Sequence, residues 1–329
     1  MKIVLAGATG FIGKALRSEL LLAGHELVVL TRGASSDAGR EKFVTWDGVA
    51  FGEWASQLDG ADAVINLVGE NIAAKRWTAE RKEKLLSSRV GATRILVAAI
   101  GQARKKPAVL INASAVGYYG PCPRSSRKVD KDRPNFQNLE IDKYWDGDVP
   151  DLDLTETSSR GEGLLAETCE QWEYEARKAE CLGVRVILAR LGPVLGENGG
   201  MLSKMIPPFR FFVGAPLGTG KQWISWVHRE DVTGSFLFML SHRELSGPVN
   251  VTSPAPVTMN DFSVALAGAL RRPCWFPIPA FLLKRVLGEM AGIVLEGQRA
   301  IPRKLLDAGY EYRYGALSAA LGSILKKRA

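Results

Sequence analysis

The sequence of 329 residues predicts an α/β fold in which a doubly wound parallel sheet carries a small C-terminal capping lobe. A glycine-rich turn between a strand and a helix opens the chain, within the segment KIVLAGATGFIG at residues 2–13. Short apolar segments then alternate with helical patterns through the first two thirds of the chain. After Arg190 the pattern changes to loops rich in glycine and proline and to short helices. The alternation predicts the sheet, and the later change predicts the lobe.

The glycines of the first turn stand at Gly7-x-x-Gly10-x-x-Gly13, a spacing typical of dinucleotide-binding folds. Gly7 permits the tight turn, and Gly10 leaves space where a phosphate must approach the backbone. Gly13 lets the following helix pack close to the sheet. The N-terminus of that helix supplies unpaired N–H groups and a favourable dipole. We therefore expect a pyrophosphate to bind at this turn.

The other elements follow in the same alternation. We expect strands, all short and rich in apolar or β-branched residues, at 2–6, 27–31, 43–46, 63–68, 109–113 and 185–190. Helices are expected at 14–23, 80–103 and 163–181, and Gly24 suits the C-terminus of the first of them. Alternation of this kind implies right-handed βαβ units and the doubly wound Rossmann arrangement.

Two domains are expected. Residues 1–195 form the Rossmann domain, and residues 196–329 form the lobe that caps a substrate pocket at the strand ends. Within the second range, about residues 228–252 return to the sheet as a helix followed by a strand.

One segment breaks the pattern of the first domain. Residues 121–154 are polar, with five cations between Arg124 and Arg133 and five acids between Asp142 and Asp153. A long segment without periodicity inside a compact domain is either a functional flap or a mobile insertion. We favour the mobile insertion.

Composition excludes several classes of protein. No run of about 18 apolar residues is present, so no membrane span and no membrane partner are expected. The first residues lack the features of a signal peptide. The four cysteines form no C-x-x-C pair and no zinc-type cluster, which favours reduced thiols in a cytoplasmic protein without a metal site.

The net charge of +8 raises the possibility of nucleic-acid binding. The cations are scattered, however, and no nucleic-acid-binding motif accompanies them. A basic surface also suits an enzyme that binds phosphorylated cofactors or anionic substrates. We therefore expect a small-molecule substrate and no nucleic-acid partner.

The end of the second strand indicates which nicotinamide cofactor is preferred. NAD-binding folds usually carry an acid there, which accepts a hydrogen bond from the ribose 2′-hydroxyl. Here the strand ends in Thr31-Arg32, without an acid. An arginine can pair with a 2′-phosphate, which a carboxylate would repel. The sequence predicts NADP(H).

Longer stretches beyond the glycine motif carry a family resemblance. They are VINLVGENI at 64–72, Arg76-Trp77, Ser88-Arg89, NASAVGYYG at 112–120, GGML at 199–202 and GKQWISWVH at 220–228. Together with GATGFIG they resemble the atypical short-chain dehydrogenase/reductase group called epimerase family proteins, within the NAD(P)-dependent epimerase/dehydratase family. This extended-type subgroup includes the bacterial YfcH-like proteins. The resemblance covers nearly the whole chain except residues 121–154.

The resemblance implies an NADP-binding Rossmann domain with a set of cofactor-binding residues along the strand ends. These are Gly7, Thr9, Gly10, Phe11 and Ile12 at the pyrophosphate, Thr31 and Arg32 at the adenosine ribose, then Leu67, Val68, Gly69, Arg89 and Val194. The position of the crevice in such sheets independently places Leu67–Gly69 and Ala113–Ser114 beside the cofactor.

Catalysis is less clearly encoded. Short-chain dehydrogenases normally use a Ser, a Tyr and a Lys, the last two as Tyr-x-x-x-Lys on one helix. Ser114 stands close to the usual serine position, with Ala115 as an alternative alignment. Matching Glu173 to the usual glutamate of that helix leaves Leu165 and Cys169 at the tyrosine and lysine positions. Neither side chain can perform that chemistry.

A literal Tyr-x-x-x-Lys match exists at Tyr174 and Lys178. It lies nine residues past Leu165, which is about 13 Å further along a helix. We interpret the match as a coincidence and expect the Tyr174 hydroxyl to lie outside reach of Ser114.

Other side chains near the strand ends could carry protons or line a substrate pocket. Tyr118 and Tyr119 follow the fifth strand, and Glu70 and Asn71 follow the fourth. We select Tyr118 beside Ser114 as a catalytic candidate, and Glu70, Asn71, Lys204 and Trp223 as pocket candidates. His228, three residues before Asp231, is interpreted as structural.

The sequence thus favours an NADP(H)-dependent oxidoreductase or epimerase-like enzyme with a non-standard proton donor. The alternative is an NADP-binding regulatory or scaffold protein without catalysis. A standard sugar-nucleotide epimerase or dehydratase is disfavoured because it needs the Tyr and the Lys.

Overall fold

The computed structural model describes residues 1–121 and 152–326. The predicted insertion at 121–154 therefore lies mostly outside the described residues. None of the helices within the described ranges is long and apolar enough to cross a membrane.

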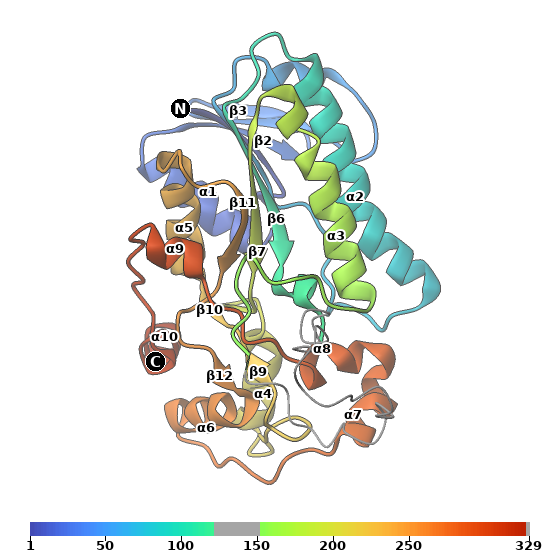
Figure 1. The fold of residues 1–329 in the computed structure, drawn as a ribbon. Coiled ribbons are helices and arrows are strands. Elements are labelled where there is room, and N and C mark those ends of the chain that lie inside the picture. Colours follow the sequence, from blue (N-terminus) through green and yellow to red (C-terminus); the bar gives the residue numbers. More distant parts are fainter. Residues whose placement is uncertain (122–151, 327–329) are drawn as a thin grey trace, which may run out of the picture.

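The described chain is built on an eight-stranded sheet of order β11-β7-β6-β5-β1-β2-β4-β3 (Figure 1). Its strands are β1 (Lys2–Ala6), β2 (Glu26–Thr31), β3 (Ser36–Ala38), β4 (Glu41–Thr45), β5 (Ala63–Asn66), β6 (Val109–Ala115), β7 (Arg185–Leu191) and β11 (Gly247–Val251). All pairings are parallel except that of the edge hairpin β3–β4. The strand order reverses between β1 and β5, so the C-terminal ends of these two strands flank the crevice where such sheets bind ligands. The predicted doubly wound parallel sheet is confirmed.

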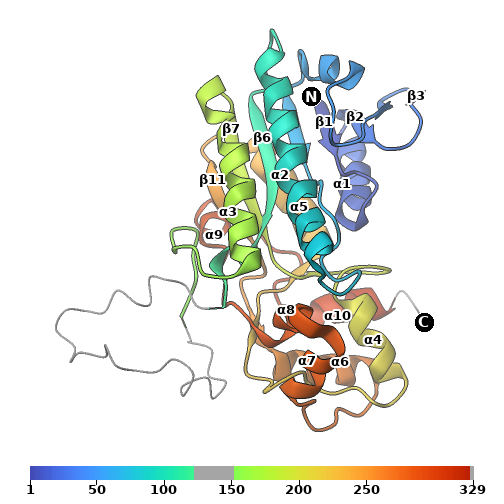
Figure 2. The ribbon, with the colours of Figure 1, turned by 90° about the vertical axis from the view of Figure 1, so that its right-hand side faces the viewer.

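Helices cover both faces of the sheet (Figures 1 and 2). One face carries α1 (Phe11–Leu22), α5 (Arg229–Ser241) and α9 (Arg303–Asp307), and the other carries α2 (Ala79–Gln102) and α3 (Leu164–Arg177). Two separate clusters of buried side chains fill the two layers. Strand residues such as Ile3 and Val4 alternate between these clusters, because successive side chains of a strand point to opposite faces.

Some element boundaries differ from those expected. The first helix begins at Phe11 rather than at residue 14, because Gly10 already caps it. The fourth parallel strand, β5, ends at Asn66 instead of continuing to residue 68. Past Asn66 the backbone closes against the glycine turn, where the carbonyl carbon of Leu67 faces Gly7. The third long helix ends at Arg177, and a short 3₁₀ turn at Glu180–Leu182 follows it.

The lobe packs its own apolar core from α4 (Leu202–Arg210), α6 (Met259–Leu270) and α10 (Leu317–Lys326). Two small strand pairs support it, β8 (Val194–Leu195) with β10 (Val227–His228) and β9 (Trp223–Ile224) with β12 (Val257–Thr258). Two short helices, α7 (Ala280–Leu287) and α8 (Gly292–Leu295), complete the lobe. Between these parts the chain returns to the sheet, because β11 pairs with β7 and α5 packs on α1.

His228 joins the lobe to the sheet layer. Its Nδ1 accepts a hydrogen bond from the Glu230 amide at 3.1 Å and so caps α5. Its ring packs on Tyr314, with the centroids 3.9 Å apart. The Asp231 carboxylate accepts the backbone amides of Arg313 and Tyr314 at 2.8 and 3.0 Å. These contacts agree with the structural role predicted for His228.

A buried polar network ties β6, β7, β11 and α3 together at one end of the sheet. Arg190 donates from Nε and Nη2 to the two Glu173 oxygens at 2.8 and 2.9 Å, a bidentate pair. Nη1 of Arg190 also bonds the Tyr119 hydroxyl at 3.1 Å. That hydroxyl lies 2.6 Å from Oδ1 of Asn250 on β11. Because both charged side chains are buried, each depends on the other for its partner.

We predict that Glu173→Gln destabilises the protein by about 3–5 kcal/mol, because it leaves the Arg190 guanidinium buried without its counter-ion. Chemical denaturation would measure the loss. Glu170→Gln on the same helix is the matched control, because the Glu170 side chain is half exposed and pairs with Arg160 at the surface. It is expected to cost less than about 1 kcal/mol. Equal losses in the two variants would contradict the assigned role of the buried pair.

Candidate cofactor and active site

The glycine turn has the geometry that a pyrophosphate requires. Gly7 has a φ of +80°, and a Cβ there would lie 2.6 Å from the carbonyl carbon of Leu67. A Cβ at Gly13 would lie 2.4 Å from the Gly7 oxygen, so this helix position must be glycine for close packing. A Cβ at Gly10 would meet only the Gly7 oxygen, at 3.5 Å. Gly7 and Gly13 are thus required by the fold, whereas Gly10 borders open space, as expected for the glycine that a phosphate approaches.

Helix α1 starts directly at this space. Its first turn has no acidic residue, and Thr9 and Gly10 are exposed beside it. The first amides of the helix therefore remain available to an anion. Phe11 and Ile12 are half-buried and anchor the helix start. The residues present fit the pyrophosphate of a dinucleotide.

The Phe11 ring is enclosed by a second glycine-rich loop, which follows β8. A Cβ at Gly196, Gly199 or Gly200 would lie 2.3–3.1 Å from ring atoms of Phe11. The Arg229 guanidinium lies 5.1 Å from the centre of the same ring. Val194, in β8 just before this loop, is buried, and its carbonyl accepts a hydrogen bond from the Met201 amide. The glycine turn after β1 and the loop that leads from β8 into the lobe are therefore packed against each other.

The end of β2 presents Arg32 to solvent. Thr31 accepts the Gly33 amide at 3.1 Å, and Thr45 at the end of β4 donates to the Gly33 carbonyl at 2.9 Å. These bonds fix the turn while leaving the Arg32 side chain exposed. No acid follows β2 directly, so the charged side chain at this strand end is a cation.

A buried polar cluster sets the ends of β5 and β6. Asn66 donates to Asn112 at 2.7 Å and to Thr93 at 2.8 Å, and its own carbonyl accepts the Val68 amide at 3.1 Å. Trp172 of α3 donates to Thr93 at 2.9 Å. The cluster fixes the backbone of the predicted cofactor residues Leu67, Val68 and Gly69, and Ala113 lies buried next to Asn112.

Arg89 lies behind this strand end rather than at the surface. Its guanidinium donates to the Leu85 carbonyl at 2.9 Å and to the Glu70 carbonyl at 2.9 Å. It also packs against the Trp172 ring, 5.4 Å from the centroid. Burial lowers the pKa of the Arg89 guanidinium. In this structure Arg89 holds the loop after β5 in place.

Glu70 forms an ion pair with Arg81, with Oε2 and Nη1 3.0 Å apart. The hydrogen bond from Arg81, with the nearby charge of Lys84, holds the pKa of the Glu70 carboxyl below its usual range. Glu70 is therefore ionised at neutral pH and cannot serve as a proton donor there. Asn71 is exposed, and its side chain accepts the Ala73 amide at 2.9 Å.

Ser114 is buried at the end of β6, and its hydroxyl donates to Glu173 at 2.7 Å. Cys169 of α3 lies beside it, with Sγ 3.8 Å from the Ala115 carbonyl oxygen. Burial, with the nearby Glu173 charge, raises the pKa of the Cys169 thiol to about 11. The serine predicted as catalytic is thus engaged with the Glu173–Arg190 network described above.

Tyr118 and Tyr119 form a short 3₁₀ turn after β6 and differ in exposure. Tyr119 is fully buried, and desolvation raises the pKa of its hydroxyl to about 12. Tyr118 is partly exposed, and its ring lies 3.5 Å from Cζ of Arg190. Among the described residues, the Tyr118 hydroxyl has no hydrogen-bond partner. Tyr118 is therefore the tyrosine at this strand end that a ligand can reach.

The literal Tyr-x-x-x-Lys pair, Tyr174 of α3 and Lys178 just after it, is exposed. Tyr174 is 63% exposed, and Lys178 lies over its ring, 4.8 Å from the centroid. Lys178 is bound to Glu175 at 2.8 Å. By contrast, Cys169 lies against β6, and a Cβ on Gly117 would lie 3.3 Å from Cβ of Leu165. This arrangement agrees with the register predicted from the sequence.

The remaining pocket candidates are spread over the lobe. Trp223 is half-buried, and Cζ of Arg299 lies 4.7 Å from its ring centre. The neighbouring Gln298 donates to the Gly120 carbonyl at 3.1 Å, so this part of the lobe adjoins the end of β6. Lys204 is exposed on α4. In residues 1–121 and 152–326, no three potential metal ligands gather in one place.

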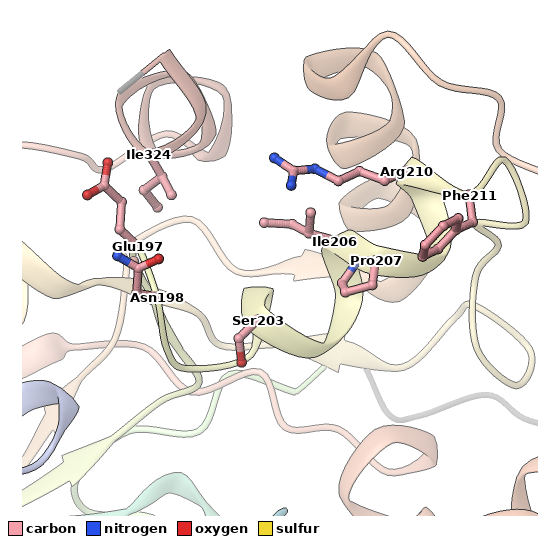
Figure 3. Close-up of a pocket in the computed structure, with 9 residues that line it drawn as sticks. Glu197, Asn198, Ser203, Ile206, Pro207, Arg210, Phe211 and Ile324 are labelled. Atoms are coloured by element: carbon pink, nitrogen blue, oxygen red, sulfur yellow. The ribbon is translucent and has the colours of Figure 1, made fainter. Parts of the chain in front are cut away.

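A cavity of about 300 Å³ lies between the loop after β8, helix α4 and helix α10 (Figure 3). Glu197 and Asn198 stand on one side of it, and Ile206, Pro207 and Arg210 of α4 stand on the other. None of the predicted pocket residues lines this cavity. It touches the cofactor region through Gly196, which also contacts Phe11.

Sequence reasoning missed the buried polar residues that support the strand ends at the site. The sequence did carry one signal for them: Asn66 and Asn112 interrupt apolar strands, and Arg190 interrupts the apolar run of β7. A polar residue inside a buried strand needs a partner, but its identity depends on the fold. Glu173, Tyr119 and Asn250 come from elements far apart in the chain.

Comparison with known proteins agrees with this geometry. Residues 3–139 match the model of the NAD dependent epimerase/dehydratase family, and residues 278–324 match a domain of unknown function, DUF1731. The human epimerase family protein SDR39U1 (isoform 2), solved with NADPH, superimposes with a TM-score of 0.81 at 30% identity, over 99% of both chains. MoeE5 in complex with UDP-glucuronic acid and NAD has a TM-score of 0.73 at 18% identity over the full length of both chains, a likeness of fold alone.

Curated relatives extend along the whole chain. The epimerase family protein YfhF of Bacillus subtilis is 35% identical over 100% of this chain and 99% of its own. The chloroplastic SDR39U1 homolog of Arabidopsis thaliana is 37% identical over 99% of this chain and 87% of its own. With the sheet order and the glycine turn, these matches show that the chain belongs to the epimerase family proteins of the atypical short-chain dehydrogenase/reductase group.

Proposed function

We propose that this protein is an NADP(H)-dependent oxidoreductase or epimerase-like enzyme that acts on a small molecule without the standard Tyr-x-x-x-Lys pair. The observation that carries the proposal is the glycine turn, where Gly10 alone of the three glycines borders open space. The NADPH bound to the human relative supports the same cofactor here. The bound nicotinamide would supply the hydride chemistry.

Arg32 supports NADP(H) over NAD(H). It is exposed at the end of β2, where a 2′-phosphate would lie, and no acid follows that strand directly, although the Glu70 carboxylate of the neighbouring loop lies within electrostatic range. Thr31 and Thr45 order the turn around it. A fixed turn with an exposed guanidinium favours the doubly charged phosphate over a neutral hydroxyl.

Tyr118 is the residue that we assign to proton transfer. The Arg190 guanidinium fixes its ring from one side, and Tyr119 packs against it edge-on, with centroids 5.6 Å apart. No described residue bonds its hydroxyl, and the turn that carries it follows β6, whose end borders the crevice. Ser114, bound to Glu173, acts in this proposal as a support for that strand end.

The alternative is a protein that binds NADP(H) without catalysis, as a regulator or scaffold. The burial of Ser114 and the outward position of Tyr174 favour it, because no complete triad is assembled. The contact between the glycine turn and the lobe would then transmit cofactor binding to the rest of the chain. A screen of carbonyl compounds with NADPH, followed by absorbance, distinguishes the two functions.

We predict that Arg32→Ala weakens NADPH binding by about 1.5–3 kcal/mol, the usual contribution of a hydrogen bond to a charged group. NADH binding should change little. Titration of cofactor fluorescence measures both affinities. Arg40→Ala is the matched control, because Arg40 is exposed on the β3–β4 turn and its removal should leave both affinities unchanged. Equal affinity of the parent protein for NADPH and NADH would refute the preference.

Gly10→Val should abolish cofactor binding while the free protein keeps its thermal stability, because the side chain fills only the phosphate space. Thermal melting with and without NADPH measures this as loss of the ligand-induced rise in Tm. Gly91→Val on α2, where a Cβ meets no atom within 4 Å, should keep that rise. Gly13→Ala, in contrast, should lower the Tm of the free protein. A normal NADPH response in Gly10→Val would place the phosphate site elsewhere.

For any substrate found in the screen, Tyr118→Phe should lower kcat by about 10²–10⁴-fold, the usual contribution of general acid–base catalysis. NADPH affinity should stay near that of the parent protein. Tyr174→Phe is the matched control and should retain full activity, because Tyr174 lies on the outer face of α3. Loss of activity in Tyr174→Phe alone would show that Tyr174 and Lys178 act as the standard catalytic pair.

A further inference from the structure

The far end of the lobe exposes a group of large apolar side chains. They come from three segments: Phe211, Phe212 and Val213 after α4, Trp275 and Phe276 between α6 and α7, and Phe281, Leu282 and Val286 on α7. We call this group the aromatic patch. Phe276 is 91% exposed and Phe211 is 78% exposed, which is unusual for side chains of this size.

The segment after α4 and the segment between α6 and α7 lie against each other. Trp275 donates from its indole N–H to the Phe212 carbonyl at 2.6 Å and from its backbone amide to Gly214 at 3.0 Å. The next residues continue the contact, because the Ile278 amide bonds the Pro216 carbonyl at 2.9 Å. Figures 1 and 2 show the connection between α6 and α7 running along the end of the lobe that is farthest from the sheet.

Helix α7, which follows this connection, is largely exposed among the described residues. None of its eight residues is buried. Its exposed apolar positions Phe281, Leu282 and Val286 are interleaved with the cations Lys284 and Arg285. Ala280, Leu283 and Leu287 form its half-buried face, so Phe281, Leu282 and Val286 are apolar side chains on the exposed side, which indicates a binding surface.

Cations predominate around the patch, although Glu296 lies within electrostatic range of Lys284 and Glu289 follows α7 closely. The chain has no Asp or Glu between Glu197 and Glu230, nor between Asp261 and Glu289. These two acid-free segments include every residue of the patch. They also carry the cations that flank it, namely Arg210, Arg271, Arg272, Lys284 and Arg285. Arg272 packs on the Phe212 ring, 4.6 Å from its centroid.

We propose that the aromatic patch binds the surface of an anionic phospholipid bilayer. Aromatic and aliphatic side chains enter the boundary between headgroups and acyl chains, and the surrounding cations pair with the headgroup phosphates. A second copy of this chain fits less well, because a two-fold contact would bring the predominant cations of both copies together with few acids to neutralise them. The protein would lie on the membrane rather than cross it.

The test is flotation of the full chain with vesicles of phosphatidylglycerol and phosphatidylcholine in equal parts, and with vesicles of phosphatidylcholine alone. We expect binding to the anionic vesicles, which decreases as salt is raised. Phe276→Ser combined with Phe281→Ser should lower the partition coefficient at least about tenfold, because it removes two inserted rings. Lys284→Glu combined with Arg285→Glu should lower it by about tenfold or more.

Two matched controls separate this site from general hydrophobicity and charge. Leu22→Ser removes an exposed apolar side chain from α1, and Lys105→Glu with Lys106→Glu makes the same charge change beyond α2. Both should bind vesicles like the parent protein. Absence of parent binding, or equal losses in the controls, overturns the proposal. So does a concentration-dependent dimer that the serine variant abolishes while vesicle binding is unchanged.

Discussion

The buried ion pair between Glu173 and Arg190 is the interaction on which the candidate site depends. Its two side chains come from α3 and β7, yet their remaining hydrogen-bonding groups reach Ser114 on β6 and Tyr119 after it. The Tyr119 hydroxyl in turn donates a hydrogen bond to Asn250 on β11. One ion pair therefore fixes three neighbouring strands at their C-terminal ends. Because an unpaired buried charge is costly, these strand ends have a single stable arrangement.

Close backbone packing supplies the second constraint. Gly7 lies against the carbonyl of Leu67, and Gly13 lies against the carbonyl of Gly7. The loop after β5 and the start of α1 are thereby joined on the two sides of the crevice. The glycines of the loop after β8 enclose Phe11 in the same way. The cofactor turn, the strand ends and the entry to the lobe thus form one rigid frame.

Much of this frame could be predicted from the sequence, and the reasons are local. The apolar run before Gly7 and the glycine spacing are properties of adjacent residues, and they located β1, the turn and α1. Arg32 was selected because it follows a strand directly, and its role at the ribose stays a prediction. Ser114 was placed correctly at the end of β6, but its burial and its bond to Glu173 depend on residues 59 positions away in the chain. The exposure of α7 was also out of reach, because an amphipathic pattern usually indicates a helix with a buried face.

The same network constrains any chemistry at the site. The Glu173–Arg190 pair is buried and each charge depends on the other, so its role at the site is to hold the strand ends. Tyr119 and Cys169 are buried and hold their protons, since desolvation raises the pKa of each well above neutrality. Glu70 is held ionised by Arg81. Among the described residues at these strand ends, the proposed function therefore assigns proton transfer to Tyr118 or to water that enters beside it, and the buried network serves to position Tyr118.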